Sequence, residues 1–96
     1  MEFNLVLTKN TFSKRKPIYS FKVQDKWGIE LSVYSMFWRF QINEGEYIEH
    51  VKSYNTFCNA GNYNDYHYPH FTSKRECRDM MRYFEGLIVM QMLMGE

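Results

Sequence analysis

The stretch SKRECRDMMRYFEGLIVMQMLM, residues 73–94, decides the fold class because it predicts one long helix more clearly than any other part of the chain. Ser73 and Glu76 have the spacing of a capping box, in which each side chain bonds the backbone amide of the other residue. The apolar residues then recur at helical spacing, at Cys77, Met80, Met81, Phe84, Leu87 and Ile88. The opposite face carries Lys74, Arg75, Arg78, Asp79, Arg82 and Glu85. The pattern therefore predicts an amphipathic helix over about 73–94.

The last part of this helix, LIVMQMLM at 87–94, is apolar nearly all round. A helix without a polar face must be covered on every side, and a small sheet covers only one side of it. The sheet and loops of the same domain could cover the rest, but we expect a second copy of the chain to do so. The predicted homodimer interface consists of Leu87, Met90, Leu93 and Met94.

The first half of the chain reads as strands because apolar and polar residues alternate. FNLVLT (3–8) and IYSFKV (18–23) alternate most clearly, and Asp25 and Gly28 supply turn chemistry after them. Further strands are expected over 29–35, 36–42 and 47–54, with a hairpin loop at 43–46, although 29–42 also fits one strand bent by a bulge. In this interpretation Trp38 points to the same side as Phe40 and Ile42.

The predicted fold class is therefore α+β. It consists of an antiparallel sheet of four or five strands at about residues 3–54, with one long C-terminal helix packed on one face. Connectors between the strands are too short for parallel crossovers, which favours antiparallel pairing. The length of 96 residues fits one domain.

Composition excludes several classes of function. The formal net charge of +1 gives no global attraction to nucleic acid or membrane. No apolar run approaches the ~20 residues of a membrane span, and the N-terminus lacks the pattern of a signal peptide. Two cysteines do not make a disulfide framework, so free thiols in a reducing cytoplasm are expected.

The segment 55–72 follows no period and is rich in Tyr, Asn, Gly and His. Loops longer than ~12–15 residues are uncommon in compact domains and often functional. Rigid rings mixed with adaptable amides are typical of recognition surfaces. Aromatic residues make up 19% of the chain, more than a small core easily encloses. The segment therefore predicts a binding loop, with a self-packed Ω-loop as the alternative.

Two chemical sites deserve weighing. Cys58, His67, His70 and Cys77 are ligands of the right kind and number for zinc, which makes a zinc-stabilised domain a second alternative. Against it, neither cysteine has a close Cys partner, and Cys77 lies on the apolar helix face. No catalytic motif is present, and that apolar position also argues against Cys77 as a nucleophile. We therefore expect neither enzymatic activity nor a cofactor.

Nucleic acid is the first alternative partner. One basic cluster contains Lys9, Lys14, Arg15 and Lys16, and the other contains Lys74, Arg75, Arg78 and Arg82. If the fold placed these beside the rings of 63–68, single-stranded nucleic acid could bind by phosphate contacts and stacking. Asp79 and Glu85 interleave opposite charges with the second cluster, which weakens its field.

The leading functional prediction is a small non-enzymatic binding protein that acts by protein–protein interaction. Tyr, Trp and Arg dominate the energetics of such interfaces. The predicted partner-binding residues are Tyr63, Tyr66, His67, Tyr68, His70, Arg75, Arg78 and Arg82. The size and character suggest a phage or mobile-element inhibitor of a host defence or nucleic-acid-handling complex. In that case Glu44, Glu46 and Glu49 could mimic phosphates.

Overall fold

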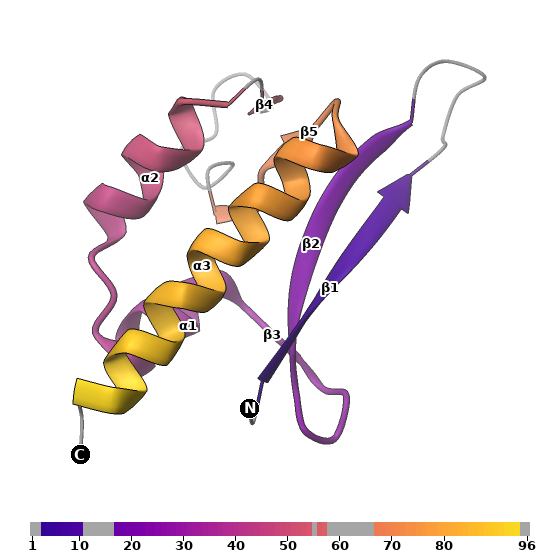
Figure 1. Cartoon of the computed structure of the whole chain (residues 1–96). Helices are drawn as coiled ribbons and strands as arrows, with labels where there is room; N and C mark the ends of the chain where they lie inside the picture. The colour runs from indigo at the N-terminus through magenta and orange to yellow at the C-terminus, as the bar shows by residue number, and fades with distance from the viewer. Residues whose placement is uncertain (1–2, 11–16, 55, 58–66, 95–96) are drawn as a thin grey trace.

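The computed structural model describes residues 3–10, 17–54, 56–57 and 67–94 of the chain, as an α+β fold (Figure 1). The elements in chain order are β1 (Phe3–Asn10), β2 (Ile18–Asp25), β3 (Glu30–Leu31), α1 (Val33–Phe40), α2 (Glu44–Lys52), β4 (Thr56–Phe57), β5 (His70–Phe71) and α3 (Lys74–Met94). The predicted fold class, an antiparallel sheet with a long C-terminal helix, is confirmed.

Strand β2 is the centre of the sheet. It pairs along its whole length with β1, from Phe3 opposite Asp25 to Asn10 opposite Ile18. Its other edge is shared by two short strands: β5 pairs at Tyr19 and β3 pairs at Val23. Strand β4 completes the order β1–β2–β5–β4, and every pairing is antiparallel. The two ends of the aperiodic 55–72 segment are thus held together by the β4–β5 pair.

All three helices lie on one face of this sheet. The alternation of β1 and β2 places Phe3, Phe21 and Val23 on that face, where all three are buried. Phe3 meets Phe40 of α1, and Phe21 meets Phe84 of α3. Figure 1 shows α3 running diagonally across the strands, with α2 beside it and α1 near its C-terminal half. The fold therefore has two layers and a single core between them.

Helix α3 confirms the predicted apolar period and one of the two hydrogen bonds of the capping box, while Glu76 Oε2 is buried without a hydrogen-bond partner in the described part of the chain. The Ser73 hydroxyl accepts a hydrogen bond from the Glu76 amide at 3.4 Å. The inner face buries Cys77, Met80, Phe84 and Ile88 completely. Within the described residues, no helix is long and apolar enough to span a membrane.

The strands expected over 29–35 and 36–42 are wrong apart from the two-residue β3, because α1 occupies Val33–Phe40. Ser32 caps this helix by accepting a bond from the Ser35 amide at 3.0 Å. Val33, Met36 and Phe37 are buried at helical spacing, i, i+3, i+4. The same apolar run fits a period of two, which is why it reads as a strand.

The strand expected over 47–54 and the hairpin loop at 43–46 are also wrong, because both lie in or next to α2. Asn43 caps α2 by accepting a bond from the Glu46 amide at 3.1 Å. Glu44 and Glu46 fall in the first turn and His50 and Lys52 in the last. This arrangement complements the helix dipole. Burial of Tyr47 and Val51 then fixes the helix on the core.

Two glycines give opposite stability predictions. Gly86 is exposed in the middle of α3, and a Cβ there would meet nothing within 4 Å. We expect Gly86→Ala to raise the free energy of unfolding by about 0.5–1 kcal/mol, because alanine favours the helix. Gly28 has φ +82°, a conformation that residues with a Cβ rarely adopt, so Gly28→Ala should lower the free energy of unfolding by about 1–2 kcal/mol. Denaturant unfolding measures both, and a neutral or destabilising Gly86→Ala would contradict the packing around α3.

Candidate functional site

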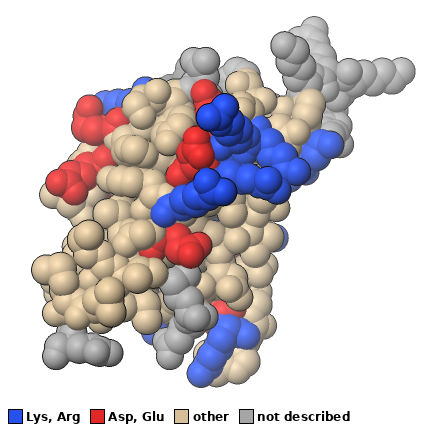
Figure 2. All heavy atoms as spheres, viewed as in Figure 1, with Lys and Arg blue, Asp and Glu red and all other residues tan. Residues whose placement is uncertain are grey.

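The solvent-facing side of the first turns of α3 forms a basic hollow. Figure 2 shows its cations gathered over the N-terminal half of the helix. The hollow is lined by Lys74, Arg75, Arg78, Asp79 and Arg82. The predicted stripe of Arg75, Arg78 and Arg82 is therefore one continuous exposed surface.

The four cations of the basic hollow are all exposed. Asp79 and Glu85 were expected to weaken the field because they interleave opposite charges with this cluster, and Asp79 does line the hollow. Within the described part of the chain, none of the cations of the basic hollow forms an ion pair with a carboxylate. The hollow is consequently a locally positive surface on a chain of nearly neutral net charge.

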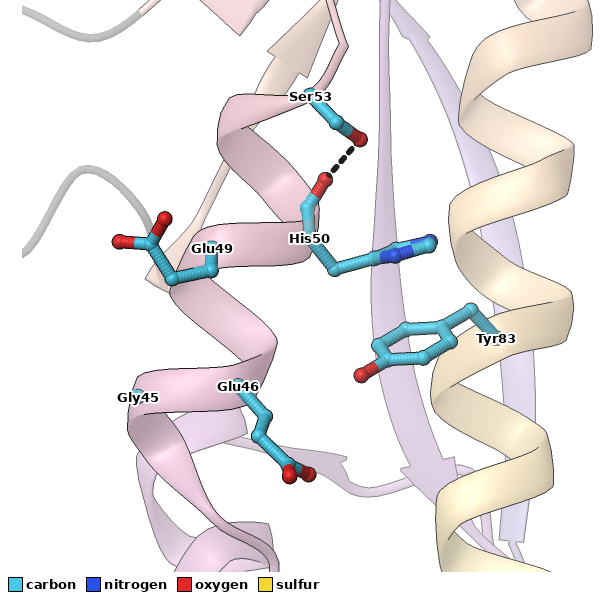
Figure 3. Close-up of a pocket in the computed structure, with 6 residues that line it drawn as sticks. All are labelled: Gly45, Glu46, Glu49, His50, Ser53 and Tyr83. Carbon is cyan, nitrogen blue, oxygen red and sulfur yellow. Dashed lines mark hydrogen bonds between the residues drawn. The ribbon is translucent and has the colours of Figure 1, made fainter.

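A second depression, the acidic groove, runs between α2 and α3 (Figure 3). It is lined by Gly45, Glu46, Glu49, His50, Ser53 and Tyr83. The His50 and Tyr83 rings stack with centroids 3.7 Å apart and planes 19° apart, which joins the two helices. The Ser53 hydroxyl donates to the His50 carbonyl at 2.6 Å and closes the C-terminal end of α2.

The acidic groove carries the opposite sign to the basic hollow. Burial, and then the negative charge of Glu46, raise the pKa of the Tyr83 hydroxyl above its ordinary value. Figure 2 shows basic side chains gathered over α3 with acidic ones among them, and further acidic side chains over α2, on the same side of the molecule. The two adjacent helices therefore present a surface of two signs, with the stacked rings between the helices.

His67 lies inside the protein and not on this surface. It is 3% exposed, and its Nε2 atom lies 2.6 Å from Glu44 Oε1. The rings of Tyr34 and Phe37 approach it edge to face. His67 thus ties the start of α2 to the chain just before β5, and its predicted role as a partner contact stays a prediction.

The other predicted contacts of the 55–72 segment have different positions. Tyr68 is exposed, and His70 is half-buried in β5. Tyr63, Tyr66 and Cys58 lie outside the described residues, as do Lys14, Arg15 and Lys16 of the first basic cluster. The structure therefore places the basic hollow and Tyr68 on the surface, but it does not bring a described ring of this segment into the hollow.

The predicted chemical sites receive no support from the described residues. Cys77 is fully buried, and burial raises the pKa of its thiol to about 12. A thiol with that pKa stays protonated at neutral pH and is a poor nucleophile or metal ligand. No three His, Cys, Asp or Glu side chains among the described residues come together as a metal-binding group.

The apolar end of α3, which was expected to be covered on every side, is largely exposed in the single chain. Met90, Leu93 and Met94 are 57%, 72% and 73% exposed. Leu87, the fourth residue of the predicted dimer interface, is half-buried and packs against the core. An uncharged apolar surface therefore adjoins the basic half of the same helix.

The sequence interpretation missed two exposed tryptophans. Trp27 and Trp38 are 74% and 78% exposed, whereas the strand interpretation had only placed Trp38 on the same side as Phe40 and Ile42. The helical spacing of Val33, Met36 and Phe37 after a Ser32 cap would have placed Trp38 outside. Exposed tryptophans of this kind are a feature of interaction surfaces.

Comparisons with known proteins add no family to this description. A scan against protein-family models and searches of curated proteins and solved structures found no match for the chain. The function must therefore be argued from the surfaces themselves.

The His67–Glu44 contact gives a stability prediction. Glu44→Ala leaves a buried imidazole nitrogen without its partner, which should lower the free energy of unfolding by about 1–3 kcal/mol. Glu46→Ala is the matched control, because Glu46 lies in the same first turn but is exposed. Chemical denaturation of both variants measures the difference. Equal losses would show that only the helix dipole matters there.

Cys77 gives a reactivity prediction. In a Cys58→Ser background the remaining thiol should resist iodoacetamide at pH 8, because burial raises its pKa and blocks access. Unfolding in guanidinium should restore the rate of an ordinary thiol, as followed by mass spectrometry. Rapid labelling of the folded protein would contradict the placement of Cys77 and reopen a role as a nucleophile.

Proposed function

We propose that this chain is a small non-enzymatic binding protein that acts by protein–protein interaction. Its contact surface is the basic hollow of α3 together with the acidic groove beside it. The observation that carries the proposal is the set of exposed α3 cations, which form no ion pair within the described residues, near the carboxylates of α2 (Figure 2). Charged patches that are complementary between two proteins give specificity and steer their association.

The two signs favour a protein over nucleic acid as the partner. A nucleic acid strand bound in the basic hollow would carry its next phosphates towards Glu46 and Glu49, one helix away. The negative charges of these phosphates and of the two glutamates would repel one another and oppose binding. A protein can instead offer carboxylates to the arginines and cations to the glutamates.

The acidic groove suggests how binding could inhibit a nucleic-acid-handling protein. Glu46 and Glu49 are both exposed on α2, where Glu46 points towards the α3 side and Glu49 away from it (Figure 3), so either carboxylate could enter a phosphate-binding site. Occupation of such a site would exclude the nucleic acid. We propose this inhibitor role for a cytoplasmic setting, where the thiols stay reduced.

Charge reversal tests the contact surface. Immobilised wild type, Arg75→Glu/Arg78→Glu and Glu46→Lys/Glu49→Lys are used to recover partners from the native host, with quantification by mass spectrometry. We expect each double variant to lower the recovery of the specific partner at least about tenfold, the scale of a lost charged contact. Lys22→Glu, on the opposite face of the sheet, is the control and should leave recovery unchanged.

Two results would contradict the proposal. Equal recovery by all variants would remove the α2–α3 surface as the contact. Binding to a single-stranded oligonucleotide that falls steeply with salt, and that the glutamate reversal strengthens, would favour nucleic acid as the partner.

Self-association through the end of α3 is a second proposal, which the exposure of Met90, Leu93 and Met94 favours. We expect the wild type to have the mass of two chains in light scattering. Met90→Glu/Leu93→Glu should give the mass of one chain, because two buried carboxylates would lie in an apolar interface. A wild-type mass of one chain at high concentration would contradict the dimer without affecting the basic hollow.

A further inference from the structure

We propose that the acidic groove binds one arginine side chain of the partner protein, with the guanidinium between the Tyr83 ring and the Glu46 carboxylate. This inference rests on the proposed function and deepens it, because it names the partner group that enters the groove. The binding element consists of one ring from α3 and one carboxylate from α2.

Tyr83 and Glu46 face a common space. The His50 ring stacks on one face of the Tyr83 ring, with centroids 3.7 Å apart. Figure 3 shows Glu46 reaching towards α3 on the side of the Tyr83 ring away from His50, whereas Glu49 points away from α3. Both Tyr83 and Glu46 line the groove, so a ligand there meets the ring and the carboxylate together.

The charge of this space is negative, although α3 carries many cations. Burial, and then Glu46, raise the pKa of the Tyr83 hydroxyl. Burial, and then the carboxylates of Asp79 and Glu76, raise the pKa of Tyr54, which lies just after α2. None of the described lysines and arginines lines the groove. The groove therefore attracts a cation and repels an anion.

The parts of the site are held in place before a partner binds. The Asn43 side chain accepts a hydrogen bond from the Glu46 amide at 3.1 Å, which fixes the first turn of α2. The stack with His50 fixes the plane of the Tyr83 ring. A site whose backbone and ring are already ordered loses little conformational entropy on binding.

Arginine fits this arrangement better than other cations. Its planar guanidinium can stack on a ring and donate two hydrogen bonds to a carboxylate, and it is weakly hydrated. A lysine ammonium is a strongly hydrated point charge, so an open groove compensates its loss of water poorly. A metal ion needs several ligands, and no three His, Cys, Asp or Glu side chains among the described residues come together to supply them.

The test uses Nα-acetyl-arginine methylamide as the probe, added to the isotope-labelled protein at constant ionic strength and followed by NMR. We expect saturable shifts of the Tyr83 and Glu46 signals. Glu46→Gln and Tyr83→Leu should each weaken binding at least about threefold, the scale of one exposed ion pair or cation–π contact. The matching lysine derivative should bind more weakly than the arginine derivative by a similar factor.

Two further variants separate the site from general effects. Tyr83→Phe keeps the ring and should restore most of the affinity that Tyr83→Leu loses. Glu85→Gln removes one negative charge from α3 outside the groove, so it should leave binding of the probe unchanged. Circular dichroism confirms that each variant is folded.

Several results would overturn the inference. No saturable shift of Tyr83, or equal binding of the arginine and lysine derivatives, would remove the guanidinium site. Equal losses in Glu46→Gln and Glu49→Gln would reduce the groove to a general acidic surface. A dimer in light scattering that Glu46→Gln dissociates would assign the arginine to a second copy.

The failure of this inference is distinguishable from the failure of the proposed function. If the probe does not bind but Glu46→Lys/Glu49→Lys still loses the partner, only the arginine site is wrong. If the probe binds as expected but the charge-reversal variants recover the partner normally, the proposed contact surface is wrong and the arginine site stands.

Discussion

The packing of the Phe84 ring in the centre of the core is the interaction on which the rest of the structure depends. Its centroid lies 6.0 Å from that of Phe21 in β2, 6.3 Å from Phe37 in α1 and 5.3 Å from Tyr47 in α2. One fully buried side chain of α3 thus joins the sheet and both short helices. Tyr47 is also fully buried, and its hydroxyl has no hydrogen-bond partner in the described part of the chain, so apolar packing holds its ring there.

This central contact determines which surfaces remain free. Because α3 turns Cys77, Met80, Phe84 and Ile88 inward, its cations and the side chains of its last turns face solvent. The position of α2 beside α3 then creates the acidic groove, and the position of α1 exposes Trp38. Each proposed contact surface is therefore a consequence of how three helices share one sheet face.

The sequence predicted α3 well and the two short helices badly, for a physical reason. Residues 73–94 contain a cap and several apolar turns, so only one period fits them. Helices of eight or nine residues are not stable alone, and their formation depends on tertiary contacts. For α1, the contact between Phe37 and Phe84 supplies that stability. The sequence around Phe37 does not reveal this long-range contact.

The residues of the candidate site likewise divide into those that the sequence could predict and those that it could not. Arg75, Arg78 and Arg82 were predictable because they lie on the well-defined helix. The acidic groove was not, because Glu46 and Glu49 were assigned to a hairpin tip and a strand, and His50 could not be expected to stack on Tyr83. The inward position of His67 could not be predicted because it depends on the contact with Glu44, which lies 23 residues away in the chain.

Denaturant unfolding of Phe84→Ala tests the central role of this ring most directly. We expect Phe84→Ala to lower the free energy of unfolding by about 3–5 kcal/mol, the usual effect of removing a buried phenylalanine side chain. All three helices should unfold in one transition. Glu85→Ala, exposed on the same helix, serves as the reference and should change the free energy of unfolding by less than about 0.5 kcal/mol. A loss below about 1 kcal/mol for Phe84→Ala, or separate transitions for the helices, would show that another contact organises the fold.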